Sequence, residues 1–157
     1  EISECLVGSE MCIRDRYTGG GYMHTTDDRT PVTFITRYYL DKIKRLCDAH
    51  GTKLLFVTAP SPVNHTMQRH NEVQALADAL AVPYLDLNLN TEELGIDWNL
   101  DTLDGGDHLN YTGCQKATAY LQRYMQTHYT LPDRRDDVRY EAWNKQAEEF
   151  EKLLPQP

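Results

Sequence analysis

Apolar residues recur at intervals of three and four positions between residues 31 and 50, which predicts an amphipathic helix there. The residues on this stripe are Val32, Ile35, Tyr39, Ile43 and Leu46. Thr30 can cap the helix with its hydroxyl, and Pro31 suits the first helical position because an N–H there would have no helical partner. We expect Gly51 to end the helix.

Two short apolar runs with a helical pattern between them predict a parallel sheet. The runs cover residues 53–58 and 82–87, and residues 67–80 carry apolar positions at helical spacing. Prolines at positions 60 and 62 exclude a helix directly after the first run. A strand, a helix and a second strand in this order are typical of an α/β fold, in which helices cover a parallel sheet.

Two further helices are predicted in the C-terminal third of the chain. Asn110 or Thr112 can cap the first of them, which keeps an apolar face to near Tyr129. A strongly charged segment follows at residues 133–139. The last helix, at about 139–154, is amphipathic because its aromatic and aliphatic residues recur at three- and four-residue spacing.

Residues 1–16 do not resemble the start of a domain, since they show no helix cap, no regular apolar period of 3.6 or 2, and no recognisable turn pattern. Residues 5–16 resemble a peptide that arises when a sequencing adaptor is translated. We therefore expect residues 1–16 to be foreign to the fold and residues 17–157 to form a single α/β domain. On this interpretation the chain is the C-terminal portion of a longer protein.

The composition is that of a globular domain and excludes several classes of partner. Of the 157 residues, 40% are hydrophobic and 10% aromatic, enough for one buried core. The net charge of −8 leaves no basic surface for nucleic acid, and no apolar run is long enough to predict a membrane segment. The four cysteines lack the spacing of a zinc site or a disulfide framework. We expect no cofactor and no metal.

Three carboxylates and one imidazole lie within eight residues, at Asp101, Asp104, Asp107 and His108. Gly105 and Gly106 allow a sharp backbone turn between them. A carboxylate close to a histidine can hold the imidazole in one tautomer, which makes the histidine a competent general base. Two other interpretations remain: an ordinary turn in which Asp107 or Asn110 caps the next helix, and a divalent-ion site formed by the four residues.

The segment Asp104-Gly-Gly-Asp-His-Leu-Asn110, with Gly113, Lys116 and Thr118 after it, resembles the C-terminal block of bacterial SGNH/GDSL hydrolases. The resemblance extends over roughly residues 32–130. It implies a flavodoxin-like three-layer α/β/α fold, incomplete here at the N-terminus, and an enzyme that hydrolyses or transfers acyl esters with Ser, His and Asp. It also implies that His108 is the general base and that an Asp before it is the orienting acid. We favour Asp104, because a side chain across the turn can fold back onto the ring, and Asp107 is the alternative.

The nucleophilic serine of this family lies in a Gly-Asp-Ser motif, which the sequence does not contain. We therefore expect the chain as given to be inactive and the nucleophile to belong to the missing N-terminal part. Ser61 follows a strand but sits between two prolines, where a turn role is expected. Trp98 lies close before the loop that carries Asp101, Asp104, Asp107 and His108, which we call the acidic loop, and it could contact a sugar or acyl group or close the sheet edge.

The resemblance implies a small-molecule or glycan acyl ester as the substrate, including esters of cell-envelope carbohydrate. A different class of function is also consistent with the residues: a non-catalytic binding domain that keeps the fold but has no nucleophile. The two hypotheses differ in whether a Gly-Asp-Ser motif precedes Tyr17 in the parent protein.

Overall fold

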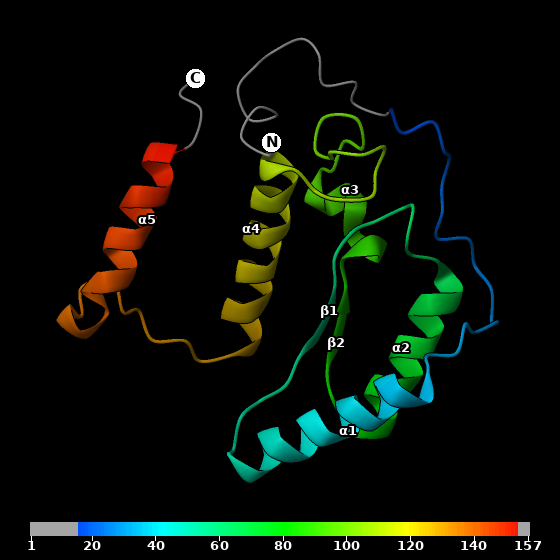
Figure 1. The fold of residues 1–157 in the computed structure, drawn as a ribbon, viewed down its shortest axis with the longest axis horizontal. Coiled ribbons are helices and arrows are strands. Elements are labelled where there is room, and N and C mark those ends of the chain that lie inside the picture. The colour runs from blue at the N-terminus through cyan, green and yellow to red at the C-terminus, as the bar shows by residue number, and fades with distance from the viewer. Residues whose placement is uncertain (1–15, 154–157) are drawn as a thin grey trace. The chain divides into compact units, whose positions relative to one another are not determined.

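The computed structural model describes residues 16–153, which form a mixed α/β structure with five α-helices and one two-stranded parallel sheet (Figure 1). The elements in order are α1 (Phe34–Ala49), β1 (Phe56–Thr58), α2 (Met67–Leu80), β2 (Tyr84–Asp86), a 3₁₀ turn (Leu87–Asn90), α3 (Thr91–Leu94), α4 (Tyr111–His128), a second 3₁₀ turn (Val138–Tyr140) and α5 (Glu141–Leu153). The chain divides into two compact units, and the boundary lies between Tyr120 and Leu121 within α4. Except for Arg16, the residues predicted to be foreign to the fold lie outside the described range.

The sheet consists of β1 and β2, which pair in parallel with Phe56 opposite Tyr84 and Thr58 opposite Asp86. The connecting helix α2 runs beside the strands and contacts β2, as Figure 1 shows. The predicted order of strand, helix and parallel strand is therefore confirmed. The strands are shorter than the predicted runs because β1 and β2 pair over three residues only.

Helix α1 is confirmed, but its first turn lies three residues later than the sequence suggested. Thr33, not Thr30, is the cap: its backbone is extended and its Oγ1 accepts the N–H of Thr36 at 3.1 Å. The helix ends at Ala49, and Gly51 has a φ of +64°, the left-handed conformation that glycine adopts without strain.

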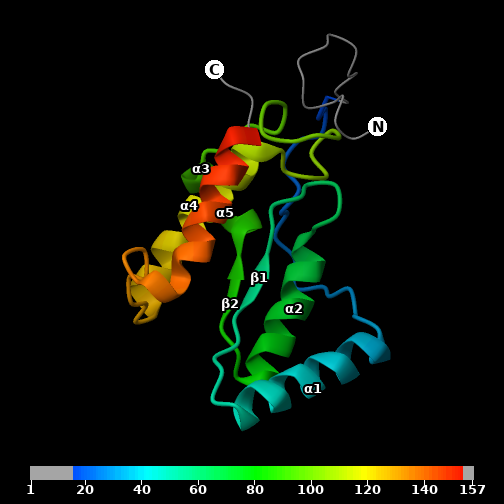
Figure 2. The same cartoon turned by 60° about the vertical axis from the view of Figure 1, so that its left-hand side comes forward.

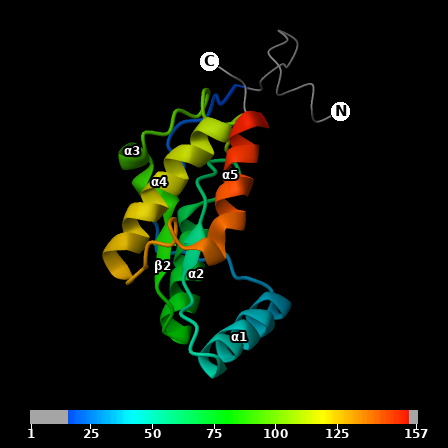
Figure 3. The ribbon, with the colours of Figure 1, turned by 90° about the vertical axis from the view of Figure 1, so that its left-hand side faces the viewer.

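The apolar core lies around α2, β2 and the segment that follows β2. It is made of Leu76, Ala77, Val82, Leu85, Leu87 and Leu94, all of which are buried. α1 contributes no buried residue, and it crosses the end of α2 away from this core (Figures 2 and 3). Its predicted stripe is open to solvent, with Ile35 66% and Leu46 62% exposed.

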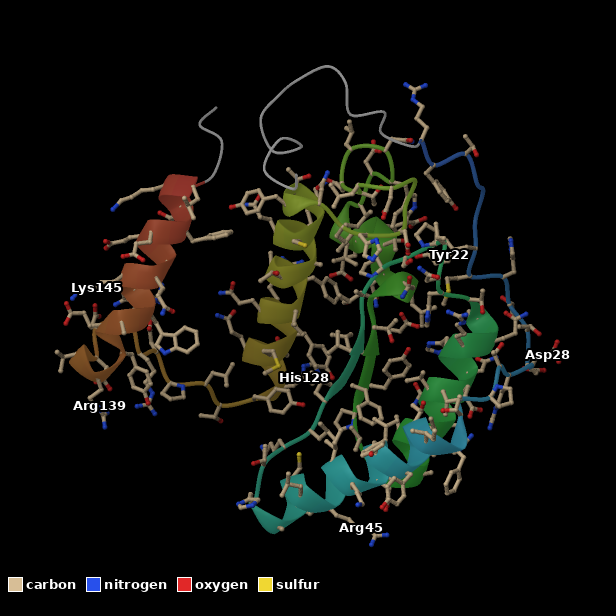
Figure 4. The ribbon with its side chains drawn as sticks, viewed as in Figure 1. Tyr22, Asp28, Arg45, His128, Arg139 and Lys145 are labelled. Carbon is tan, nitrogen blue, oxygen red and sulfur yellow. The ribbon has the colours of Figure 1, made fainter. Side chains whose placement is uncertain are left out.

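The segment before α1 is held against α2 by main-chain and side-chain hydrogen bonds. The side-chain amide of Asn71 donates to the carbonyl oxygens of Thr26, at 2.7 Å, and Asp28, at 2.9 Å. Arg37 of α1 forms an ion pair with the buried Glu72 of α2. Figure 4 marks Asp28 at the outer side of α2 and Tyr22 near the end of the strands. Polar contacts therefore hold the segment from Thr26 to Arg37 against α2.

The C-terminal unit contains the end of α4, the second 3₁₀ turn and α5. Asp137 caps the turn by accepting the N–H of Arg139 at 3.1 Å, and α5 follows at once. The predicted amphipathic helix at 139–154 agrees with α5 to within two residues, and Leu154 lies outside the described range. Among residues 16–153, no helix is both long enough and apolar enough to span a bilayer.

Candidate functional site

The acidic loop between α3 and α4 is a short antiparallel turn closed by backbone hydrogen bonds. Thr102 pairs with Leu109, and the N–H of Leu103 donates to the carbonyl of His108 at 2.9 Å. Gly105 and Gly106 have φ values of +64° and +101°, which residues with a side chain rarely adopt. The predicted sharp turn is therefore confirmed, and it brings the side chains on its two arms together.

Asp101, at the start of this loop, is buried and holds the loop in place through hydrogen bonds. Its carboxylate is buried and accepts hydrogen bonds from Lys116 Nζ at 2.6 Å, Thr112 Oγ1 at 2.8 Å and the N–H of Asp97 at 2.8 Å. Burial alone would raise the pKa of Asp101, but these hydrogen bonds and the Lys116 charge lower it below the ordinary value. The Asp101 carboxylate is thus occupied by hydrogen bonds within the chain and has a structural role in the loop.

The first turn of α4 packs directly on this anchor. Asn110 caps the helix, since its Oδ1 accepts the N–H of Gly113 at 3.1 Å, which confirms one of the two predicted caps. A Cβ at Gly113 would overlap the carbonyl oxygen of Asp101. Only glycine therefore lets the helix approach the loop this closely.

Asp104 and His108 face each other across the turn. The imidazole Nδ1 lies 2.7 Å from Asp104 Oδ2, and the backbone N–H of His108 donates to Oδ1 of the same carboxylate at 2.8 Å. The His108 side chain is 68% exposed and the Asp104 side chain is 46% exposed. The hydrogen bond and charge of Asp104, with a smaller effect of Asp107, raise the pKa of His108, and the same hydrogen bond lowers the pKa of Asp104.

Asp107, the alternative acid, is held in a different direction. Its Oδ1 accepts hydrogen bonds from Asn64 Nδ2 and, at 3.3 Å, from Ser61 Oγ. Its Oδ2 lies 3.5 Å from His108 Nδ1, beyond a good hydrogen bond. The loop after β1, which carries Ser61 and Asn64, is therefore in contact with the acidic loop.

Ser61 is the only serine within residues 16–153. Its hydroxyl accepts the N–H of Asn64 at 3.1 Å and donates to Asp107, so it is engaged as a turn residue next to the site. Within the described range, no hydrogen bond to Nε2 of His108 is present. The imidazole therefore has one nitrogen bound to a carboxylate and the other directed to solvent.

The four residues considered for a divalent ion are not all brought together. Asp104, Asp107 and His108 have potential ligand atoms within 4.8 Å of one another, whereas Asp101 is bound to Lys116. The three that converge are on an exposed loop, and the Nδ1 of His108 already contacts both carboxylates. The short contact in this group is the hydrogen bond between His108 Nδ1 and Asp104.

A second polar cluster, which the sequence did not indicate, joins the start of α2 to the end of β2. Asp86 Oδ2 lies 2.8 Å from His65 Nε2 and 2.7 Å from His70 Nδ1, and it accepts from the Tyr84 hydroxyl at 3.1 Å. Its Oδ1 accepts from the backbone and side chain of Asn88. Burial would raise the pKa of Asp86, but the hydrogen bonds from His65, Asn88 and His70 outweigh it and lower the pKa.

The carboxylate of this second cluster is satisfied by hydrogen bonds from within the chain. Asp86 is buried and accepts five of them, so its charge is compensated without a further ligand. The only sequence signal was the position of Asp86 at the carboxyl end of a strand. The exposed imidazole of His108 is therefore the better candidate for chemistry.

Comparison with known proteins adds no further assignment: no protein-family model, no curated protein and no solved structure matches this chain. A histidine held by a carboxylate at Nδ1 and exposed at Nε2 can accept a proton from a hydroxyl or a water molecule. Asp104 would stabilise the imidazolium that forms.

Proposed function

We propose that His108 and Asp104 are the general base and the orienting acid of an SGNH-type serine esterase or acyltransferase. The observation that carries this proposal is the 2.7 Å contact between His108 Nδ1 and Asp104 Oδ2. This contact places the proton on Nδ1 and leaves the Nε2 lone pair available to a nucleophile. The parallel sheet with α2 as its connection is consistent with part of a flavodoxin-like three-layer fold.

The proposal assigns a specific chemical role to each residue. Nε2 of His108 takes the proton of a serine hydroxyl while that oxygen attacks the acyl carbon, and the imidazolium then protonates the leaving alcohol. Asp104 stays ionised, since its pKa is lowered, and favours the charged imidazole in the transition state. No other serine is available in residues 16–153, and Ser61 bonds to Asp107. We therefore place the nucleophile in a segment that precedes Tyr17 in the parent protein.

The test is to read the genomic frame upstream of the Tyr17 codon and to assay the complete gene product on short-chain p-nitrophenyl esters. We expect a strand that ends in Gly-Asp-Ser, and esterase activity that falls by ~10³-fold or more in His108→Ala. His128→Ala is the matched control, because His128 is exposed and its Nδ1 bonds only to a carbonyl of its own helix, that of Tyr124. A fluorophosphonate probe should label the complete product and leave the 157-residue chain unlabelled. Equal activity of the two histidine variants would refute the proposal.

A non-catalytic binding domain is the second candidate, and one observation favours it. The hydroxyl of Ser61, the only described serine, points to Asp107 and leaves the imidazole without a nucleophile. If the upstream frame encodes no Gly-Asp-Ser and the complete product hydrolyses no ester, this candidate replaces the first.

A further inference from the structure

A buried group of side chains at the end of the sheet brings two imidazoles and one carboxylate together. His65 directly precedes Thr66, the cap of α2, whereas His70 lies in the first turn of that helix and Asp86 ends β2. Potential ligand atoms of the two histidines and the aspartate lie within 4.8 Å of one another, and we call these three residues the His–Asp cluster. Their side chains are only 8%, 14% and 1% exposed, in chain order, so the His–Asp cluster is buried.

The carboxylate of Asp86 has more hydrogen-bond donors than lone pairs. An ionised carboxylate offers about four lone-pair sites, about two on each oxygen. The backbone and side-chain N–H groups of Asn88 occupy those of Oδ1. Three donors converge on Oδ2: His65 Nε2 at 2.8 Å, His70 Nδ1 at 2.7 Å and the Tyr84 hydroxyl at 3.1 Å. These donors compensate the charge of the carboxylate, but Oδ2 cannot direct a lone pair at each of them.

A divalent ion would remove this excess because it takes the place of the two imidazole protons. A carboxylate accepts hydrogen bonds and donates none, so each ring nitrogen that faces Oδ2 carries a proton when no ion is bound. When each neutral imidazole carries its proton on the other nitrogen instead, His65 Nε2 and His70 Nδ1 present lone pairs to the ion. Oδ2 then binds one ion and keeps one hydrogen bond, that of Tyr84.

The donor set selects a first-row transition ion, and zinc fits it best. Imidazole suits zinc, copper, iron and nickel, whereas magnesium and calcium prefer oxygen ligands. Zinc has no geometric preference from its d electrons, and two histidines with one carboxylate are a set that it uses, with water in the fourth position. Bonds of about 2.0–2.2 Å would place tetrahedral ligand atoms about 3.3 Å apart. From the present separations of 2.7 and 2.8 Å, the imidazoles need to move only about half an ångström.

The surroundings hold these ligands in position, as the outer groups of metal sites do. The Asn88 side chain donates to Oδ1 of the carboxylate at 2.7 Å, which leaves Oδ2 directed at the imidazoles. The ring of Tyr84 stacks on that of His70, with centroids 5.4 Å apart. The N–H of His65 donates to the carbonyl of Ser61 at 2.9 Å and fixes the turn before α2. The edge of His70, the most exposed of the three ligands, gives an ion access from solvent.

We propose that the His–Asp cluster binds one zinc ion, which joins the start of α2 to the end of β2. The spacing of the cysteines gave no indication of such a site, because its ligands are two histidines and a carboxylate from separate elements. The ion links residues that are 16 and 21 positions apart, so its binding stabilises the folded chain. The inference is independent of the proposed esterase, since it involves neither His108 nor a serine.

The first test is a titration of the untagged 157-residue chain with zinc chloride, followed by calorimetry and by NMR of the histidine ring nitrogens. We expect one tight site per chain, with shifts of His65 Nε2 and His70 Nδ1. His128 is the internal reference, because its Nδ1 bonds to the carbonyl of Tyr124 in its own helix, and its signals should not shift. This measurement needs no variant, so it does not depend on how a substitution affects folding. Unchanged signals of His65 and His70 in excess zinc would overturn the inference.

A matched pair of variants then assigns the ligands. His70→Gln keeps a hydrogen-bond donor for Asp86 but removes the imidazole. We expect it to weaken zinc binding about 100-fold or more, since loss of an outer partner alone costs about 10- to 100-fold. His128→Gln makes the same substitution at an exposed position, and it should bind zinc as the wild-type chain does, as should His108→Gln. If His70→Gln keeps the wild-type affinity, or if His108→Gln loses zinc binding, the ion is held elsewhere and the inference is wrong.

Discussion

At the scale of single residues, two carboxylates compete for the same nitrogen of His108. Asp104 obtains the short contact because the positive φ values of Gly105 and Gly106 fold the chain back by four residues. Asp107 is adjacent to the histidine, yet Asn64 and Ser61 draw its carboxylate toward the loop after β1. The sequence favoured Asp104 from the turn alone, but the contact that restrains Asp107 spans more than 40 residues and leaves no local pattern.

The pKa of His108 tests which carboxylate is its main partner, since the hydrogen bond and charge of Asp104 raise it. We expect an NMR titration of the 157-residue chain to give a His108 pKa above the ordinary value of 6.5. Asp104→Asn should return the pKa toward 6.5, because the main hydrogen bond and charge that favour the protonated ring are lost. Asp107→Asn, the matched control, should shift it less. A larger shift in Asp107→Asn would show that the adjacent carboxylate is the true partner.

The raised pKa of His108 determines how the stability of the fold and the proposed activity should each change with pH. A histidine whose pKa is raised by folding stabilises the folded state fully below the unfolded value of 6.5, and this stabilisation is lost as the pH rises through the raised pKa. The general base that we propose must be neutral to accept a proton, so the proposed esterase activity should instead rise with pH through that same pKa. In Asp104→Asn the rising limb should move to lower pH.

At the scale of elements, α4 depends on a glycine within its own first turn. Ala normally stabilises a helix interior relative to Gly by about 0.5–1 kcal/mol. At position 113 a Cβ would instead overlap the Asp101 carbonyl, so α4 or the acidic loop would have to move. We expect Gly113→Ala to lower the free energy of unfolding by about 1–3 kcal/mol, measured by urea denaturation.

The controls separate packing from helix propensity. Thr118→Ala makes a similar change of propensity at an exposed position of α4, and it should alter stability by about 0.5 kcal/mol or less. Gly113→Ala should also broaden or shift the NMR signal of His108, since the helix start and the acidic loop share Asp101. If Gly113→Ala were more stable than the wild-type chain, the close approach of α4 to the loop would be incorrect.

The helices and the order of the two strands could be predicted from the sequence because each has a local pattern. α2 begins and ends where its apolar spacing predicted, at residues 67–80, and the parallel pairing follows from the helix between the strands. The cap of α1 was misplaced because Thr30 and Thr33 both precede apolar positions, and only the backbone angles distinguish them. The cluster around Asp86 could not be predicted, since its histidines lie 16 and 21 residues away.

At the scale of the whole molecule, the apolar surface is not fully covered within residues 16–153. α1 exposes a row of large apolar side chains along its length: Phe34, Ile35, Tyr38, Tyr39, Ile43 and Leu46. A two-stranded parallel sheet also leaves main-chain groups of both strands available for further pairing. Surfaces of this kind are typical of sites that associate.

We expect the 157-residue chain to self-associate through α1 in a concentration-dependent manner, as measured by sedimentation velocity. Leu46→Lys should weaken association by about tenfold or more, because burial of a leucine side chain contributes about 1.5–3 kcal/mol. Lysine is tolerated there because position 46 is exposed, and its charge is favourable near the C-terminal end of the helix. Thr52→Lys adds the same charge beyond the end of α1 and should leave association unchanged. A chain that stays monomeric at all concentrations would show that the exposed face of α1 does not associate.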